Sequence, residues 1–216
     1  MHDITLYIGQ TNLSTQDAIL ARDVLERVTG LVPRTGELLT SELLTSDELT
    51  PPAIGQYWHS QGGTYAGVMR GEKGAPDYHL IAPPHAWIES ITYGGDGYSV
   101  VGADHIRDGL ANTQALLAHD IDHPAASWAS QQQADGHRDL YLPSRAEAYL
   151  CWANIPEQFE RKVYHITSTQ LGPSFAWIQV FDAGYQNAGR KGYARPAFAV
   201  RRILIPSTLN ALSPRA

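Results

Sequence analysis

The densest cluster of groups that could do chemistry in this sequence is the stretch HDIDH at residues 119–123. Its two imidazoles and two carboxylates belong to His119, Asp120, Asp122 and His123. Both types of group are common ligands of divalent metals. In a turn, however, the same side chains would cap the helix that Pro124 is expected to begin. We interpret the cluster as structural, with a metal site as the second hypothesis and hydrolytic chemistry as the third.

Other signatures of catalysis are missing from the sequence. No G-x-S-x-G elbow occurs, and Ser144 is explained better as a helix cap than as a nucleophile. The single cysteine, Cys151, excludes a multi-cysteine zinc site and a disulfide framework within the chain, and we expect it to be inert. The GGTYAG stretch at 62–67 lacks the lysine and hydroxyl residue of a phosphate-binding loop. We therefore predict that the protein is not an enzyme and needs no cofactor.

A different mixture of residues, between positions 164 and 193, suits binding. Aromatic rings are interspersed there with amides and cations, which are groups that dominate binding energy at recognition surfaces. We predict ligand contacts from Tyr164, His165, Gln170, Phe175, Tyr185, Gln186, Asn187, Arg190, Lys191 and Tyr193. The part from Tyr185 to Tyr193 is expected to be a long loop. Trp177 and Phe181 alternate in a strand, so we expect both of them in the core.

The elements that must position these residues are short. Strands are expected over 63–69, 78–82, 164–170, 175–181 and 198–205, with a further hairpin over 86–102 that turns at the glycines 94, 95 and 97. Helices are expected within 105–119, from Pro124 to Gly136 and from Arg145 to about Ala153. The last of these begins at an S-x-x-E capping box formed by Ser144 and Glu147. Such a mixture of short elements predicts an α+β fold.

The first part of the chain has a different character. Ile4, Leu6 and Ile8 alternate with polar residues and predict a short strand, after which Ser14 is expected to cap a helix over 15–29. The sequence ELLTS then occurs twice before the pair Pro51-Pro52, which is typical of a linker. We therefore expect an attachment or oligomerisation segment at 1–52, followed by the main domain at 53–216.

Composition excludes several classes of protein. The 216 residues are 43% hydrophobic and 18% charged, which suits a globular protein with a sizeable core. The formal net charge of -6 argues against nucleic acid as a partner, because binding a polyanion normally requires a basic face. No basic, apolar leader begins the chain and no apolar run could span a bilayer, so we expect cytoplasmic synthesis without membrane insertion.

Seven short segments follow one another in a recognisable order. They are GGTYAG at 62–67, DYHLI at 77–81, ANT at 111–113, DLYLPSRAE at 139–147, YHITST at 164–169, AWIQVFDAG at 176–184 and AVRR at 199–202. Together they resemble the C-terminal domain of bacterial collagen-like adhesins, the Lcl C-terminal family, which also recurs in phage tail and prophage proteins. The resemblance covers roughly residues 57 to 205 and leaves the N-terminal segment outside it.

This resemblance implies a C-type-lectin-like fold, in which two helices and a twisted antiparallel sheet carry irregular loops that form the ligand-binding surface. Members of the family look like adhesion or receptor-binding modules, and the collagen-like adhesins are trimers. The sequence departs from the family at His165, where many members carry tryptophan, and around Leu140 and Tyr141. It also lacks the signatures of calcium-dependent sugar-binding lectins, which argues against that mode of carbohydrate binding.

The resemblance implies a non-enzymatic recognition module of a phage or prophage tail, placed at the tail tip, fibre or baseplate. Such a protein would be made in the host cytoplasm and located in the virion, as a homo-oligomer for which the family suggests a trimer. Its expected partners are other phage tail proteins and a glycan or protein of the host cell surface. The alternative is a structural tail or baseplate protein whose loops contact only other virion proteins. A metal-dependent hydrolase that uses the HDIDH cluster is the third hypothesis.

Overall fold

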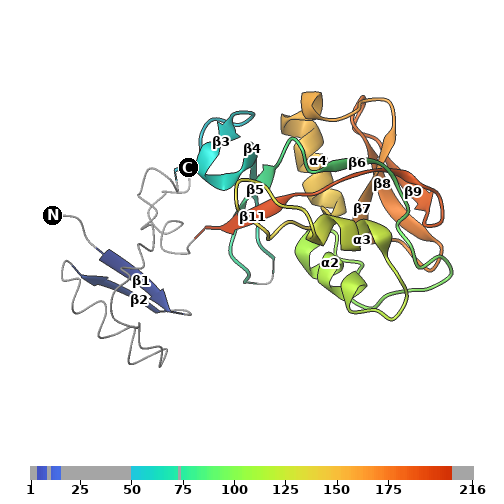
Figure 1. Cartoon of the computed structure of the whole chain (residues 1–216), viewed down its shortest axis with the longest axis horizontal. Helices are drawn as coiled ribbons and strands as arrows, with labels where there is room; N and C mark the ends of the chain where they lie inside the picture. The colour runs from blue at the N-terminus through green and yellow to red at the C-terminus, as the bar shows by residue number, and fades with distance from the viewer. Residues whose placement is uncertain (1–3, 9–10, 16–49, 73, 206–216) are drawn as a thin grey trace. The chain divides into compact units, whose positions relative to one another are not determined.

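The computed structural model describes residues 4–8, 11–15, 50–72 and 74–205 (Figure 1). The chain divides into two compact units, Met1–Leu44 and Thr45–Ala216. From the sequence we expected a division at residue 52 between an attachment segment and a recognition domain, and those two roles stay predictions.

The first unit contains an antiparallel hairpin of β1 (Ile4–Ile8) and β2 (Thr11–Thr15), in which Ile4 pairs with Thr15. The strand predicted at the start of the chain is thereby confirmed. Ser14 belongs to β2, so the prediction that it caps a helix is wrong, because its backbone is already paired in the hairpin. The remainder of that predicted helix and the duplicated ELLTS stretch lie outside the described residues.

The second unit is an α+β domain whose described residues form three antiparallel sheets and three α-helices. The largest sheet, in the order β11-β5-β4-β3, consists of β3 (Tyr57–Trp58), β4 (Gly63–Met69), β5 (Tyr78–Ala82) and β11 (Arg201–Leu204). The second sheet consists of β7 (Tyr164–Gln170), β8 (Phe175–Val180) and β9 (Gln186–Arg190), and the third of β6 (Trp87–Ile91) and β10 (Arg195–Phe198). The helices are α2 (Gly109–Leu117), α3 (Pro124–Ser130) and α4 (Arg145–Asn154), and the 3₁₀ turns are η1 (His59–Gln61) and η2 (Pro156–Gln158).

Helix α4 connects the two larger sheets, because it packs against β4 on one side and against β7 and β8 on the other (Figure 1). It begins at the predicted capping box, which is confirmed. The Oγ of Ser144 accepts a hydrogen bond of 3.3 Å from the Glu147 amide, and the Glu147 carboxylate accepts one of 2.7 Å from the Ser144 amide. Each partner therefore satisfies a backbone donor that the first helical turn leaves free.

The hairpin predicted over 86–102 is wrong in its second half. Only β6 forms there, and it pairs with β10 instead of with residues 98–101. Gly94 and Gly95 have φ angles of +83° and +58°, and a Cβ on either residue would overlap the backbone or ring of the segment at 122–124. The glycines therefore let the chain pack closely on the HDIDH turn instead of reversing into a second strand.

The strand predicted over 198–205 is interrupted. It is split between β10, which ends at Phe198, and β11, which begins at Arg201. Between them, Val200 exchanges two backbone hydrogen bonds of 2.8 and 2.9 Å with Tyr141. At this bridge the chain leaves the sheet that contains β6 and joins the sheet that contains β5. The sequence of residues 198–205 does not reveal this change of partner strand.

The helix predicted from Pro124 to Gly136 is too long, because α3 ends at Ser130. Asp135 and Gly136 have positive φ angles of 47° and 86°, and Ala134 forms an isolated antiparallel bridge with His137. Two consecutive left-handed residues cannot continue a right-handed helix, so the segment after α3 is a turn.

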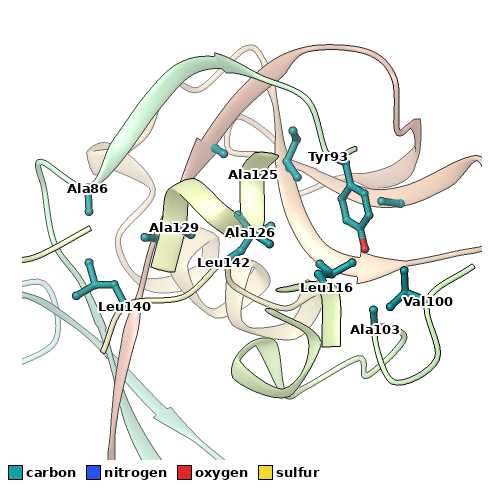
Figure 2. Packing of buried hydrophobic residues seen from close by; sticks show 14 residues of the cluster. Ala86, Tyr93, Val100, Ala103, Leu116, Ala125, Ala126, Ala129, Leu140 and Leu142 are labelled. Atoms are coloured by element: carbon teal, nitrogen blue, oxygen red, sulfur yellow. The ribbon is translucent and has the colours of Figure 1, made fainter. Parts of the chain in front are cut away.

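The core consists of two main clusters. One gathers around the alanines of α3 with Leu116, Leu142 and Ile166 (Figure 2). The other packs α4 against the largest sheet and includes Tyr141 and Phe181. Of the two residues that we predicted in the core, Phe181 is fully buried, whereas Trp177 is only half-buried. Cys151 is also fully buried, and burial raises the pKa of its thiol, which disfavours the reactive thiolate.

Candidate functional site

Three loops converge at one end of the sheet formed by β7, β8 and β9. Backbone hydrogen bonds join Gly97 to Pro173 at 3.1 Å and Lys191 to Ser174 at 3.0 Å. The loops therefore belong to one structure although the first of them is far from the others in sequence. We call residues 96–101, 171–175 and 190–195 the sheet tip.

The buried side chain of Lys191 connects these loops by hydrogen bonds. Its side chain is fully buried, and its Nζ donates hydrogen bonds of 2.7 Å to the Tyr98 carbonyl and 3.2 Å to Oε1 of Gln170. The Gln170 amide in turn bonds both the N–H and the carbonyl of Val100. Burial lowers the pKa of Lys191 to about 8, and the negative charge of Asp96 opposes this shift. Lys191 and Gln170, which we predicted as ligand contacts, are thus supports of the sheet tip and do not lie on its surface.

The surface of the sheet tip is aromatic and aliphatic. Val101 is 97% exposed and Tyr193 is 62% exposed, an unusual degree of exposure for side chains that gain free energy from burial. The other exposed apolar side chains of the sheet tip are those of Tyr98, Leu171 and Phe175. The guanidinium of Arg190 lies 5.4 Å from the centre of the Phe175 ring, within the range of a cation–π interaction. Phe175, Arg190 and Tyr193 are therefore predicted contacts that the structure does bring to one end of the sheet.

The predicted loop from Tyr185 to Tyr193 is wrong over its first half, where residues 186–190 form β9 and pair with β8. This strand separates Tyr185 from the sheet tip, because the rise along its four steps is about 13 Å. Tyr164 lies at the same end as Tyr185, since it pairs with Val180 at the opposite end of β8 from Phe175. Tyr185 is exposed, but it cannot share one compact ligand with Tyr193.

Two amides near Tyr185 differ in their surroundings. Gln186 is held inside a network, in which its Nε2 donates to the Arg145 carbonyl at 2.7 Å and to Oε1 of Gln179 at 2.8 Å. The Arg145 guanidinium covers the half-buried Trp177 ring, with its carbon 3.6 Å from the ring centre. Asn187 is exposed, and its Oδ1 accepts a hydrogen bond from the next residue. We conclude that Gln186 serves the scaffold.

His165 is buried near the start of β7 and lies apart from the sheet tip. Its ring is enclosed by Phe159, Phe181 and Phe198, with ring centres 5.0 to 6.2 Å away. Within the described residues, its Nδ1 has no hydrogen-bond partner. Burial lowers the pKa of His165 to about 4, so the ring is neutral at pH 7. His165 also forms part of the wall of a pocket of about 190 Å³ beside β6.

The HDIDH cluster forms the turn before α3. His119 and His123 are in contact, with ring centres 5.5 Å apart, and the backbone N–H of Ile121 donates a bond of 3.2 Å to Nδ1 of His119. His123 occupies the N-cap position of α3, but its side chain makes no capping bond, so the capping role expected for it is wrong. Instead it is buried against Tyr93, and burial lowers its pKa. Among the described residues, no group of three or more histidine, cysteine or carboxylate side chains is arranged to hold a metal ion.

Sequence reasoning missed the contribution of Tyr98, Val101 and Leu171 to the sheet tip. Val100 and Val101 are adjacent, and neighbouring side chains of an extended chain point to opposite sides, so the pair could have indicated one exposed valine. That signal could not have placed the valine beside Tyr193, which follows Val101 by more than ninety positions in the sequence.

No family model matches the chain, and no curated protein matches it either. The resemblance to the Lcl C-terminal family therefore stays a prediction. None of the helices within the described parts of the chain has the length and apolar character required to cross a bilayer.

Proposed function

We propose that this protein is a non-enzymatic recognition module of a phage or prophage tail, and that the sheet tip is its receptor-binding surface. The observation that carries the proposal is the combination of a buried support with an exposed apolar surface. Lys191 holds the loops in place from beneath, while Val101 and Tyr193 are presented to solvent. A preorganised surface of this kind loses little conformational entropy when it binds a partner.

The residue types of the sheet tip suit binding. Tyrosine and arginine are the residues that most often dominate the energy of recognition, and the sheet tip presents Tyr98, Arg190 and Tyr193. The aliphatic side chains of Val101 and Leu171 favour a protein receptor over a glycan, because the hydroxyl groups of a sugar need polar partners when they are buried. The receptor that fits this surface best is therefore a protein exposed on the host cell.

The arrangement of elements supports the finer assignment to a C-type-lectin-like fold. Antiparallel sheets combine with helices α2 and α4, and the loops of the sheet tip gather at one end of a three-stranded sheet (Figure 1). The resemblance noted from the sequence implies the same parts in the same roles. In this proposal, residues 1–52 attach the domain to a neighbouring tail protein or to sister subunits of an oligomer in the virion.

The test is whether the isolated chain binds host cells. We expect fluorescently labelled protein to bind cells of the host strain in a saturable way and to be displaced by unlabelled protein. Treatment of the cells with a protease should abolish the binding, since the surface favours a protein receptor. A chain that binds no cells but forms a tight complex with a neighbouring tail protein would contradict the proposal and favour a structural role.

A further inference from the structure

A second site lies at the other end of the domain. A pocket of about 190 Å³ opens beside β6, at the opposite end of β7 from the sheet tip. Its walls include Trp87, Gln158, Phe159, Glu160, His165 and Phe198. These residues belong to several elements that pack together, so the pocket is a property of the folded domain and not of one loop.

Aromatic side chains that pack on one another form part of the pocket walls. Phe159 stacks on Phe181 with ring centres 4.1 Å apart and lies 4.6 Å from Phe198, which fixes its orientation. Trp87 pairs with Phe198 across β6 and β10, yet its side chain is 55% exposed at the pocket. A tryptophan that contributes to a pocket wall and remains half in solvent offers a flat face on which a ring can stack.

The size of the pocket selects a ligand of one ring. An apolar cavity of about 150 Å³ is known to hold one benzene molecule, and this pocket is only slightly larger. Most drug-sized ligands need pockets of about 300 Å³ or more, so they would not fit. A sugar ring would bring several hydroxyl groups against walls in which only Gln158, Glu160 and His165 carry polar side chains, and the unpaired hydroxyls would oppose binding.

The charge of the pocket selects among aromatic rings. Glu160 carries the single formal charge of the lining, since the set contains neither lysine nor arginine and the buried His165 is neutral at pH 7. Glu160 is exposed and Gln158 is half-buried, so both can meet a polar group at the mouth. A carboxylate accepts hydrogen bonds and repels anions. The pocket therefore favours a ring that carries a donor or a positive charge.

We propose that this pocket binds a single aromatic ring that bears a hydrogen-bond donor, such as an arylalkylamine or a phenol. The ring lies between Trp87 and Phe159, and the donor faces Glu160. This site is separate from the sheet tip, so it adds a small-ligand function to a domain whose other end recognises a receptor.

The test is an NMR titration of the full ¹⁵N-labelled chain with phenethylamine, phenylacetate and glucose. We expect phenethylamine to cause saturable shifts centred on the Trp87 indole and on Phe159, at least about threefold tighter than phenylacetate. Glucose should cause no saturable shift. A capped tripeptide with a central tyrosine tests the source of the ring, because tighter binding than phenethylamine assigns the ring to a partner protein and weaker binding assigns it to a free molecule.

Matched variants test whether phenethylamine binds in this pocket. Trp87→Ala should weaken phenethylamine at least about fivefold. Glu160→Gln should remove the preference over phenylacetate, and Tyr193→Ala at the sheet tip should leave both affinities unchanged. Because Trp87 and Glu160 are exposed, the domain should still fold in these variants, which their unperturbed spectra away from the pocket would show. Shifts centred elsewhere, equal affinity for phenylacetate, or unchanged binding by Trp87→Ala would overturn the proposal.

Discussion

The buried Nζ of Lys191 lies 3.2 Å from Oε1 of Gln170 and donates a hydrogen bond to it. The same glutamine oxygen accepts a bond of 3.0 Å from the amide of Val100, so it serves two donors from two loops. The hydrogen bonds of Lys191 and Gln170 therefore hold the three loops of the sheet tip together. Two carbonyl-type oxygens, from Tyr98 and Gln170, stabilise the buried ammonium group of Lys191.

Gln170→Ala should strongly destabilise the domain. The change removes the partner of the Val100 amide and carbonyl and one of the two acceptors of Lys191, which leaves buried polar groups unpaired. We expect a loss of about 3 kcal/mol in the free energy of unfolding, measured by urea denaturation. Gln114→Ala, an exposed change of the same type in α2, is the control and should cost less than about 0.5 kcal/mol. Equal stability of the two variants would contradict the role given to Gln170.

The same variant should change the titration of Lys191. In the wild-type domain we expect NMR of the lysine side chain to give a pKa of about 8, because burial disfavours the charged form. Gln170→Ala removes a hydrogen bond that favours the ammonium, so the pKa should fall further. A pKa near the ordinary value of about 10.4 would mean that the side chain is in solvent.

Glu147→Ala should lower the free energy of unfolding by more than the loss of a helix cap alone would. The buried carboxylate accepts hydrogen bonds of 2.7 Å from the hydroxyls of Tyr78 and Tyr141 as well as from the Ser144 amide. We expect about 3 to 5 kcal/mol for Glu147→Ala in chemical denaturation. Ser144→Ala should cost about 1 kcal/mol, because it removes only the cap. The exposed Glu157→Ala serves as the control, and a similar loss in all three variants would refute this account.

His165 should make stability depend on pH in the acidic range. Its pKa is lowered to about 4 in the folded domain, whereas an unfolded histidine titrates near 6.5. As the pH falls from 6.5 to 4, the unfolded chain takes up a proton that the folded domain does not, so stability is lost. The loss should reach about 3 kcal/mol relative to His165→Phe, as measured by denaturation at each pH. Parallel pH profiles of the two proteins would show that His165 is not buried as a neutral ring.

Sequence patterns correctly predicted the elements that are determined by interactions between residues close together in the sequence. The S-x-x-E pair at Ser144 and Glu147 satisfies donors within one helical turn, so the start of α4 could be predicted from the sequence. Strands β4, β5 and β7 lie where alternation and turn residues placed them. By contrast, β9 has the sequence QNAGR, which lacks β-branched and aromatic residues and becomes a strand only because it pairs with β8.

The candidate site was only partly predictable for a related reason. Lysine is rarely fully buried, so a lysine beside aromatic residues was expected on the surface. The burial of Lys191 depends on Tyr98, which precedes it by more than ninety positions, and no local pattern carries that information. Phe175, Arg190 and Tyr193 are exposed at the sheet tip, which is compatible with the ligand contacts predicted for them, and those contacts stay a prediction.

The most direct test of the central claim compares two ends of one sheet in the host-cell binding assay. Val101→Ser combined with Tyr193→Ala removes exposed apolar surface from the sheet tip, and Tyr185→Ala removes an equally exposed ring at the other end. We expect the sheet-tip variant to lose at least about tenfold in affinity, while Tyr185→Ala stays within about twofold of the wild type. The opposite result, with the sheet-tip variant unchanged and Tyr185→Ala impaired, would contradict the account.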